Sequence, residues 1–137
     1  MSESVIKQTT VGAKTNRVAF LLQPETAFQI SVMVGNTGVT NDANGRKIIK
    51  AGTPIGGTTS ALETRSTVLQ QTNTSALGAN TQGILSYEVD VTNGAVSTSM
   101  IVAGRIDTSR LPAEIVAEAK TALESNGRFI FLNGGAY

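Results

Sequence analysis

The clearest chemical candidates in this sequence are two carboxylates two positions apart, Glu88 and Asp90. Residues i and i+2 of an extended strand project from one face, so the two carboxylates would lie side by side. Such pairs hydrolyse glycosidic bonds in many enzymes. Sugar sites usually add aromatic platforms, but here Tyr87 points to the opposite face and the chain has no Trp. The pattern therefore favours a solvated polar face, with Asp90 capping the turn that follows it.

A second candidate is Asp42-Ala-Asn44-Gly45, which matches the opening of a calcium loop. A calcium loop closes on a bidentate Glu six residues after the Gly, and this chain has Ala51 there. The glycine-rich stretches 35–38 and 52–57 lack the Lys-Ser/Thr pair of a phosphate-binding loop. Turns account for all three stretches, so we expect neither a metal site nor a cofactor.

The composition excludes several kinds of catalysis. The chain has 137 residues with no His and no Cys, which excludes Ser-His-Asp triads, Cys-His pairs and thiolate chemistry. We therefore expect a protein that is not an enzyme, and the remaining enzymatic hypothesis is a hydrolase that uses Glu88 and Asp90. A net charge of +1 gives no electrostatic basis for binding nucleic acid or an anionic membrane. The longest apolar run, 18–22, is far shorter than the ~20 residues that span a bilayer.

The elements that must position these residues are mostly strands. Residues 17–23 are a short apolar run that predicts a first strand, and apolar residues at 28, 30, 32 and 34 alternate with others in a second. A short strand is expected at 47–50, and Pro and Gly predict irregular structure at 51–57. Residues 58–82 show the weakest pattern and are expected to form a long surface loop.

The second half of the chain has the sharper pattern. Alternation at 83–91 and 96–106, separated by Thr92-Asn93-Gly94, predicts a β-hairpin. Apolar residues at 115, 116, 119, 122 and 123 lie on one helical face, with Pro112 suited to the first turn, Ser109 as a candidate cap and Asn126-Gly127 as the end. A final strand is expected at 128–132.

These elements predict a mostly β (α+β) protein. We expect residues 1–17 to form an extended N-terminal arm and residues 18–137 to form a single domain, a small β-barrel or sandwich-like fold with one C-terminal helix and a final strand. The charged fraction is 15%, against roughly 25% in an average domain. The surface is therefore expected to be largely neutral and polar, supplied by the 18 Thr and by Ser and Asn.

The order of motifs from residue 47 to residue 132 resembles that of tailed-phage head fiber and head decoration proteins. The motifs are Lys50-Ala-Gly-Thr-Pro54, then the segment Gly83-Ile-Leu-Ser-Tyr-Glu-Val-Asp-Val-Thr-Asn-Gly94, then Met100-Ile-Val-Ala-Gly-Arg-Ile-Asp107 with Leu111-Pro112, and finally the helix and Phe129–Leu132. The resemblance covers about the last two thirds of the chain, and the 83–94 segment is its most specific part. No repeat follows that would build a long fiber, which favours a decoration knob.

The resemblance implies a structural virion protein on the outer surface of the capsid, made in the host cytoplasm, that decorates or stabilises the mature head. It implies the major capsid protein as the partner and a homotrimer as the assembly. The alternative function is a β-rich adhesin or carbohydrate-binding module displayed on the capsid, which would bind a host-surface glycan through residues 58–82.

Two groups of residues are the candidate contacts. An extended arm can add a strand to the sheet edge of a shell protein, so the capsid-contact candidates are Val5, Ile6, Lys7 and Val11. The turn that carries the Gly-Thr-Pro motif could face the shell or a neighbouring subunit, so Ile48, Ile49, Thr53 and Pro54 are the second group.

Overall fold

The computed structural model describes residues 20–22, 27–125 and 128–132. The protein is mostly β, with one helix near the C-terminus followed by a final strand, which confirms the expected fold class. The strands are β1 (Leu21–Leu22), β2 (Phe28–Val34), β3 (Ile48–Ile49), β4 (Pro54–Gly56), β5 (Val68–Gln71), β6 (Thr81–Leu85), β7 (Val89–Asp90), β8 (Val96–Asp107) and β9 (Phe129–Leu132). The helical elements are the 3₁₀ turns η2 (Gly78–Asn80) and η3 (Thr108–Arg110) and the helix α2 (Ala117–Glu124).

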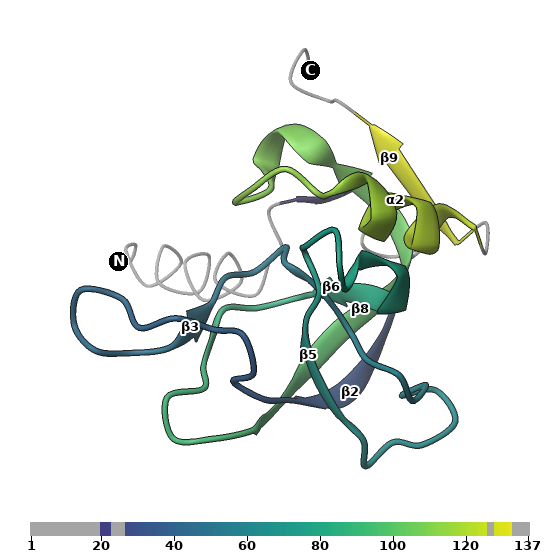
Figure 1. Ribbon diagram of the computed structural model, residues 1–137. Coiled ribbons are helices and arrows are strands. Elements are labelled where there is room, and N and C mark those ends of the chain that lie inside the picture. The colour runs from purple at the N-terminus through teal and green to yellow at the C-terminus, as the bar shows by residue number, and fades with distance from the viewer. Residues whose placement is uncertain (1–19, 23–26, 126–127, 133–137) are drawn as a thin grey trace, which may run out of the picture.

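Five strands close into a small barrel. The sheet runs β8-β2-β5-β4-β6, and β6 pairs again with β8 to complete the circle (Figure 1). The β2–β5 pair is parallel and the other four pairs are antiparallel. β2 and β8 have the longest pairing, with Val34 opposite Val96 and Phe28 opposite Ala103. The sequence left open whether the fold is a small barrel or sandwich-like, and the closed circle of strands is a barrel.

The barrel interior is filled by aliphatic side chains and one methionine. Alternate residues of β2 point inward, as the period of two predicts. The buried cluster consists of Ile30, Val32, Val34, Ile49, Ile55, Ala61, Leu69, Leu85, Val91, Met100 and Val102. None of these residues is aromatic, so the barrel core depends on close packing of small branched side chains.

A second layer covers one side of the barrel. The C-terminal half of β8 continues beyond the barrel and pairs with β1 on one side and with β9, in parallel, on the other. The helix α2 lies against β9 and β6, above the barrel strands in Figure 1. The second cluster of buried residues lies between them and consists of Phe20, Leu21, Ile84, Ile101, Ile106, Leu123 and Phe129. We refer to β1, β9, α2 and this end of β8 as the C-terminal layer.

A loop between β2 and β3 projects from the barrel on the side opposite to α2 (left in Figure 1). Asp42 Oδ1 accepts hydrogen bonds from the backbone N–H of Asn44 at 2.8 Å and of Arg46 at 3.0 Å. Gly45, with a φ of +77°, completes the turn. The Asp-Ala-Asn-Gly sequence is thus a turn held by its own carboxylate, which is the structural interpretation favoured from the sequence.

Three local expectations were wrong. Residues 51–57 contain a strand, β4, because Pro54 occupies the first position of the strand and Gly56 passes close to another backbone segment. Residues 58–82 contain β5, η2 and the start of β6, so they are not one long loop. Segment 83–91 is split: β6 pairs with β8, whereas β7 pairs with β3.

Candidate binding surfaces

The two groups of predicted contact residues have different outcomes. Val5, Ile6, Lys7 and Val11 lie outside the described residues, so their assignment stays a prediction. Ile49 and Pro54 are buried within the domain, where they pack or pair with other parts of the chain. These two side chains do not offer an exposed contact surface, which corrects the prediction for them. Ile48 and Thr53 are half-buried at the same turn.

The turn itself is a structural junction. Gly52 has a φ of +94°, and a Cβ there would lie 2.8 Å from Pro112 Cδ and 3.1 Å from Leu111 Cδ2. Gly52 N–H donates to Leu85 C=O at 2.8 Å, and Leu85 N–H donates to Thr53 C=O at 2.9 Å. Only glycine satisfies both the backbone conformation and the close approach at this position. The Gly-Thr-Pro, Gly-Ile-Leu and Leu-Pro motifs are therefore in direct contact.

The carboxylate pair does not form a shared site. Both Glu88 and Asp90 are exposed. Asp90 Oδ1 accepts hydrogen bonds from the Thr92 hydroxyl and from Thr92 N–H, the second at 3.0 Å. These bonds, with the side-chain bond as the larger cause, hold the pKa of Asp90 below its ordinary value, and Arg46 lies 3.7 Å away. Asp90 thus caps the turn after β7, as the sequence indicated.

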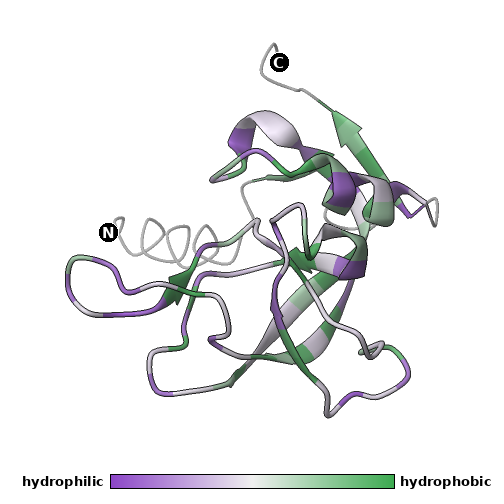
Figure 2. Ribbon diagram, in the orientation of Figure 1, coloured by the Kyte–Doolittle hydropathy of each residue, from purple (hydrophilic) through white to green (hydrophobic). Residues whose placement is uncertain are grey.

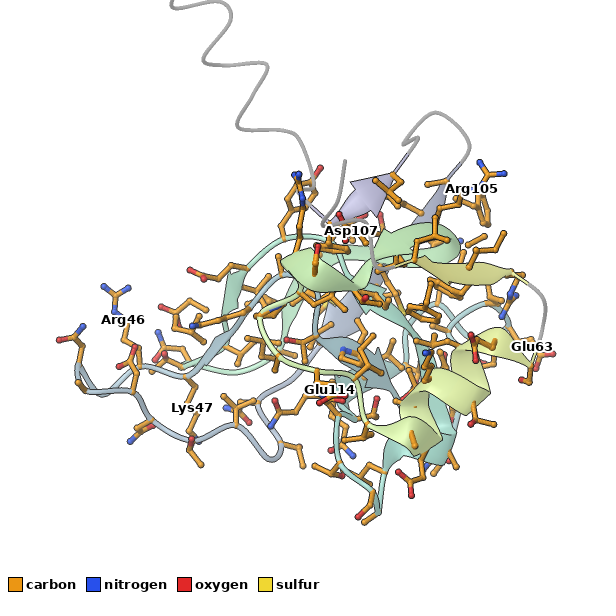
Figure 3. All side chains as sticks on the ribbon, turned by 90° about the horizontal axis from the view of Figure 1, so that it is seen from above. Arg46, Lys47, Glu63, Arg105, Asp107 and Glu114 are labelled. Carbon is orange, nitrogen blue, oxygen red and sulfur yellow. The ribbon has the colours of Figure 1, made fainter. Side chains whose placement is uncertain are left out.

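Charged groups are dispersed over the molecule. Figure 3 shows Arg46 and Lys47 on the projecting loop, far from Arg105 and Glu63. No group of three or more His, Cys, Asp or Glu capable of holding a metal ion occurs among the residues that the structure describes. In the same part of the chain, no helix is long and apolar enough to cross a membrane.

A hollow lies in the C-terminal layer. It is a groove of about 530 Å³ between the segment after η3, α2 and β9. The apolar part of its lining is Leu111, Pro112, Ala113, Ile115 and Phe131, and the polar part is Thr108, Glu114 and Lys120. The Lys120 ammonium lies 5.7 Å from the centre of the Phe131 ring, within the range of a cation–π contact.

The strand β9 is hydrophobic along its length (Figure 2). Phe129 and Phe131 pair with Gly104 and Ile106 and face the buried core of the C-terminal layer. Ile130 and Leu132 occupy the alternate positions, so they project from the opposite face and are 48% and 42% exposed. These two exposed large aliphatic side chains form a local apolar surface on the face of β9 opposite to Phe131, which lines the groove.

A smaller cleft of about 230 Å³ lies on the barrel beside β5. Most of its lining comes from the stretch 58–82, which was the candidate for a glycan site. The lining contains Thr, Gln, Asn, Gly, Val and Leu but no aromatic ring. The loop at 57–61 is tied down by Gln82, which donates to the Gly57 and Thr59 carbonyls and accepts from Ala61 N–H.

One positioning residue was missed from the sequence. Asn73 follows β5 and bridges to the start of α2: its Oδ1 accepts from Val116 N–H at 2.9 Å and its Nδ2 donates to Glu114 C=O at 3.1 Å. The expected cap, Ser109, belongs instead to η3, where Asp107 accepts its N–H. No sequence signal links Asn73 with Val116, because the contact joins residues 43 positions apart.

No protein-family model matches the chain, and a search of curated proteins also gives no match. The resemblance to head decoration proteins therefore stays a prediction from the order of the motifs in the sequence.

Proposed function

We propose that this protein is a structural virion protein that binds the outer surface of a tailed-phage capsid and decorates or stabilises the mature head. The observation that carries the proposal is that three of the motifs of the resemblance meet around Gly52. The Lys-Ala-Gly-Thr-Pro turn, the Gly-Ile-Leu strand and the Leu-Pro pair meet there, although 60 residues separate Gly52 from Pro112 along the chain.

The C-terminal layer supplies a surface suited to a protein partner. Ile130 and Leu132 lie exposed on one face of β9, and the groove with its apolar lining lies on the other face, where Phe131 points. Clusters of exposed aliphatic side chains are characteristic of protein interaction sites. In the proposal this surface rests on the major capsid protein, and the arm residues Val5, Ile6, Lys7 and Val11 add a strand to an edge of the shell.

The proposed mechanism is stabilisation by selective binding. A protein that binds only the expanded shell favours that state by mass action. If three copies act together as a homotrimer, each assembly engages three sites at once and the apparent affinity rises without any new kind of contact. The protein then resists the outward pressure of the packaged genome by raising the cost of shell rearrangement.

The test is co-sedimentation of the purified protein with heads of its source phage that have been stripped of it. Saturable binding to expanded heads, with little binding to unexpanded heads, is the expected result. Absence of binding to both forms would overturn the proposal. Deletion of residues 2–12 should abolish binding while the far-ultraviolet circular dichroism of the domain persists, and full occupancy by that variant would remove the arm from the mechanism.

The contribution of β9 has its own matched control. We expect the double variant Ile130→Ser with Leu132→Ser to weaken binding to expanded heads by at least about tenfold, because buried apolar contacts dominate such interfaces. The control is Leu62→Ser, which removes an aliphatic side chain of similar exposure on a barrel loop. Equal losses for both variants would argue against a surface centred on β9.

A further inference from the structure

The strand β9 is an edge of the sheet in the C-terminal layer and lies at the periphery of the molecule in Figure 1. It pairs in parallel with β8 and, among the residues that the structure describes, with no other strand. Its register has no shift, and Phe129–Leu132 contains no Pro and no charged side chain. Bulges, prolines and charges are the usual protection of an edge strand, so β9 is open to pairing with another strand.

Two hydrogen bonds show which backbone groups face the open side of β9. Arg128 C=O accepts from Gly104 N–H at 2.9 Å, and Leu132 C=O accepts from the hydroxyl of the first residue of η3 at 3.2 Å. Both carbonyls are thus directed toward the β8 side. Successive residues of a strand direct their N–H and C=O groups to alternate sides, so those of Phe129 and Phe131 face away from β8. The open side therefore presents two N–H and two C=O groups to an added strand.

A second copy of β9 satisfies these groups when the two strands run antiparallel. With Phe129 opposite Phe131 of the second copy, and the reverse, each pair exchanges two backbone hydrogen bonds, so the two strands form about four. Ile130 then lies opposite Ile130 of the second copy, on a two-fold axis. The neighbouring symmetric registers place Phe129 or Phe131 opposite itself and form about two such bonds within the strand. The directions of the backbone groups therefore favour the register centred on Ile130.

The exposed side chains of β9 fit the same register. Ile130 and Leu132 are 48% and 42% exposed. Directly opposite residues of an antiparallel pair lie on the same face, and apolar pairs there are stabilising. Ile130 packs against its counterpart on the axis, and Leu132 packs against the aliphatic stem of Arg128 of the second copy. The two Arg128 positions are about 13 Å apart along the strands, so their like charges do not meet.

We propose that two copies of the free protein associate through β9, as an antiparallel pair centred on Ile130. The sheet of β1, β8 and β9 in each copy then continues into the sheet of the other. The contact is small, because each copy supplies one four-residue strand, and interfaces below about 1,200 Å² of total buried area are weak. We therefore expect a monomer–dimer equilibrium that depends on concentration. This inference depends neither on capsid binding nor on the trimer proposed for the shell.

Ile130→Cys tests the two-fold axis directly, because the natural chain has no cysteine. Opposite Cα atoms in a non-hydrogen-bonded antiparallel pair are about 4.5 Å apart, a distance that a disulfide bridges. The control is Leu62→Cys on a barrel loop, since Leu62 is 46% exposed. Under the same mild oxidation, we expect at least about tenfold more disulfide-linked dimer from Ile130→Cys, because pairing holds the two thiols together. An equal yield from the two variants would overturn the proposal.

A charge exchange at the same position tests the symmetry without cysteines. Ile130→Lys and Ile130→Glu each place like charges opposite one another on the axis, which destabilises a strand pair. We expect each variant alone to associate at least about tenfold more weakly than the natural chain, and an equimolar mixture to regain the dimer because Lys then faces Glu. Leu62→Lys and Leu62→Glu are the controls and should associate as the natural chain does.

Sedimentation equilibrium measures all of these associations. A natural chain that stays monomeric up to about 1 mM, or that forms a trimer in solution, would overturn the proposal. So would a mixture of Ile130→Lys and Ile130→Glu that associates no better than either variant alone. Circular dichroism checks that each variant is folded, which we expect because Ile130 is exposed. None of these experiments uses phage heads, so their failure would leave the proposed function standing.

Discussion

The barrel and the C-terminal layer are built from different residues, although they share β8. The barrel core contains aliphatic side chains and a methionine, whereas the core of the C-terminal layer contains Phe20 and Phe129 with Phe131 at its margin. The barrel surrounds its core with short strands, and the layer presses one helix against three strands. Three of the four Phe residues therefore pack in the C-terminal layer, whose strands do not close into a barrel.

The same contrast holds for the surfaces. On the barrel, Gln29 Oε1 accepts hydrogen bonds from the hydroxyls of Ser86 and Ser99, so neutral polar groups satisfy one another. The C-terminal layer instead carries the groove and the exposed pair Ile130 and Leu132. In the proposed function, the barrel is a self-contained support and the C-terminal layer supplies the surface that contacts the capsid.

The largest expected effect tests whether the two regions unfold together. Phe129→Ala should lower the free energy of unfolding by about 3–5 kcal/mol, and Met100→Ala in the barrel by about 2–5 kcal/mol. Because β8 runs through both cores, we expect a single urea transition in each variant, followed by circular dichroism. Two separate transitions in Phe129→Ala would show that the regions are independent units. Ile130→Ala, on the exposed face of β9, is the matched control and should change stability by less than about 0.5 kcal/mol.

The next effect probes the contact between barrel and helix. A Cβ on Gly78 would lie 2.6 Å from Glu118 Cβ and 2.7 Å from Ala119 N, so Gly78→Ala must push α2 away from η2. We expect a loss of about 1–3 kcal/mol in urea unfolding. Gly57→Ala is the control, because its Cβ would meet only Leu69 Cδ2 at 3.6 Å. A similar loss in both variants would mean that glycine content, rather than this contact, sets the stability.

A smaller effect is expected where the barrel caps the helix. Asn73→Ala removes the acceptor of Val116 N–H and the donor to Glu114 C=O, which should cost about 1–2 kcal/mol. Asn73→Asp keeps the acceptor and should lose less stability than Asn73→Ala. Thermal unfolding of both variants measures the difference. An Asp variant as unstable as the Ala variant would contradict a capping role for this side chain.

The smallest effect concerns the projecting loop. Hydrogen bonds from the backbone of Arg46 and Asn44 lower the pKa of Asp42, and bonds from Thr92 lower that of Asp90. A carboxyl group whose pKa is lower in the folded state than in the unfolded state stabilises the fold at any pH above its unfolded-state pKa, which is near 3.8. This contribution is lost as the pH falls through the folded-state pKa. The double variant Asp42→Asn with Asp90→Asn should therefore lose less stability than the natural chain between pH 4 and pH 2. An identical pH dependence would exclude these two carboxylates as contributors.

Regular alternation made much of the fold predictable. β2 was expected as it occurs, and the apolar positions expected for β8 and β9 lie in those elements. The helix was predicted to begin too early, because Ile115 and Val116 precede α2 and Pro112 is not in its first turn. β4 and β5 were missed because they are three and four residues long, and a period of two is hard to detect over so few positions. Their pairing is set by distant strands, which single-sequence patterns do not report.

The candidate surfaces were less predictable than the fold. Phe28 belongs to the apolar series of β2, but it is exposed at the start of the strand, where the register with β8 shifts, so the series alone assigns it wrongly to the core. Ile49 and Pro54 were chosen because they flank the conspicuous Gly-Thr-Pro motif. The structure shows that this turn packs tightly against Leu111 and Pro112 around Gly52, so both side chains are buried. A conspicuous motif in this chain marks a tight junction more reliably than an exposed contact.

The central position of β8 also sets the order in which the chain can fold during synthesis. β2 pairs with β8 from Val34–Val96 to Phe28–Ala103, so more than sixty residues separate the partners. At about 5–20 residues per second, the ribosome needs roughly 4–15 s after finishing β2 to complete β8. During that interval β2 has no long partner and the barrel stays open, so this strand is the part of the nascent chain most exposed to misassociation and to chaperones.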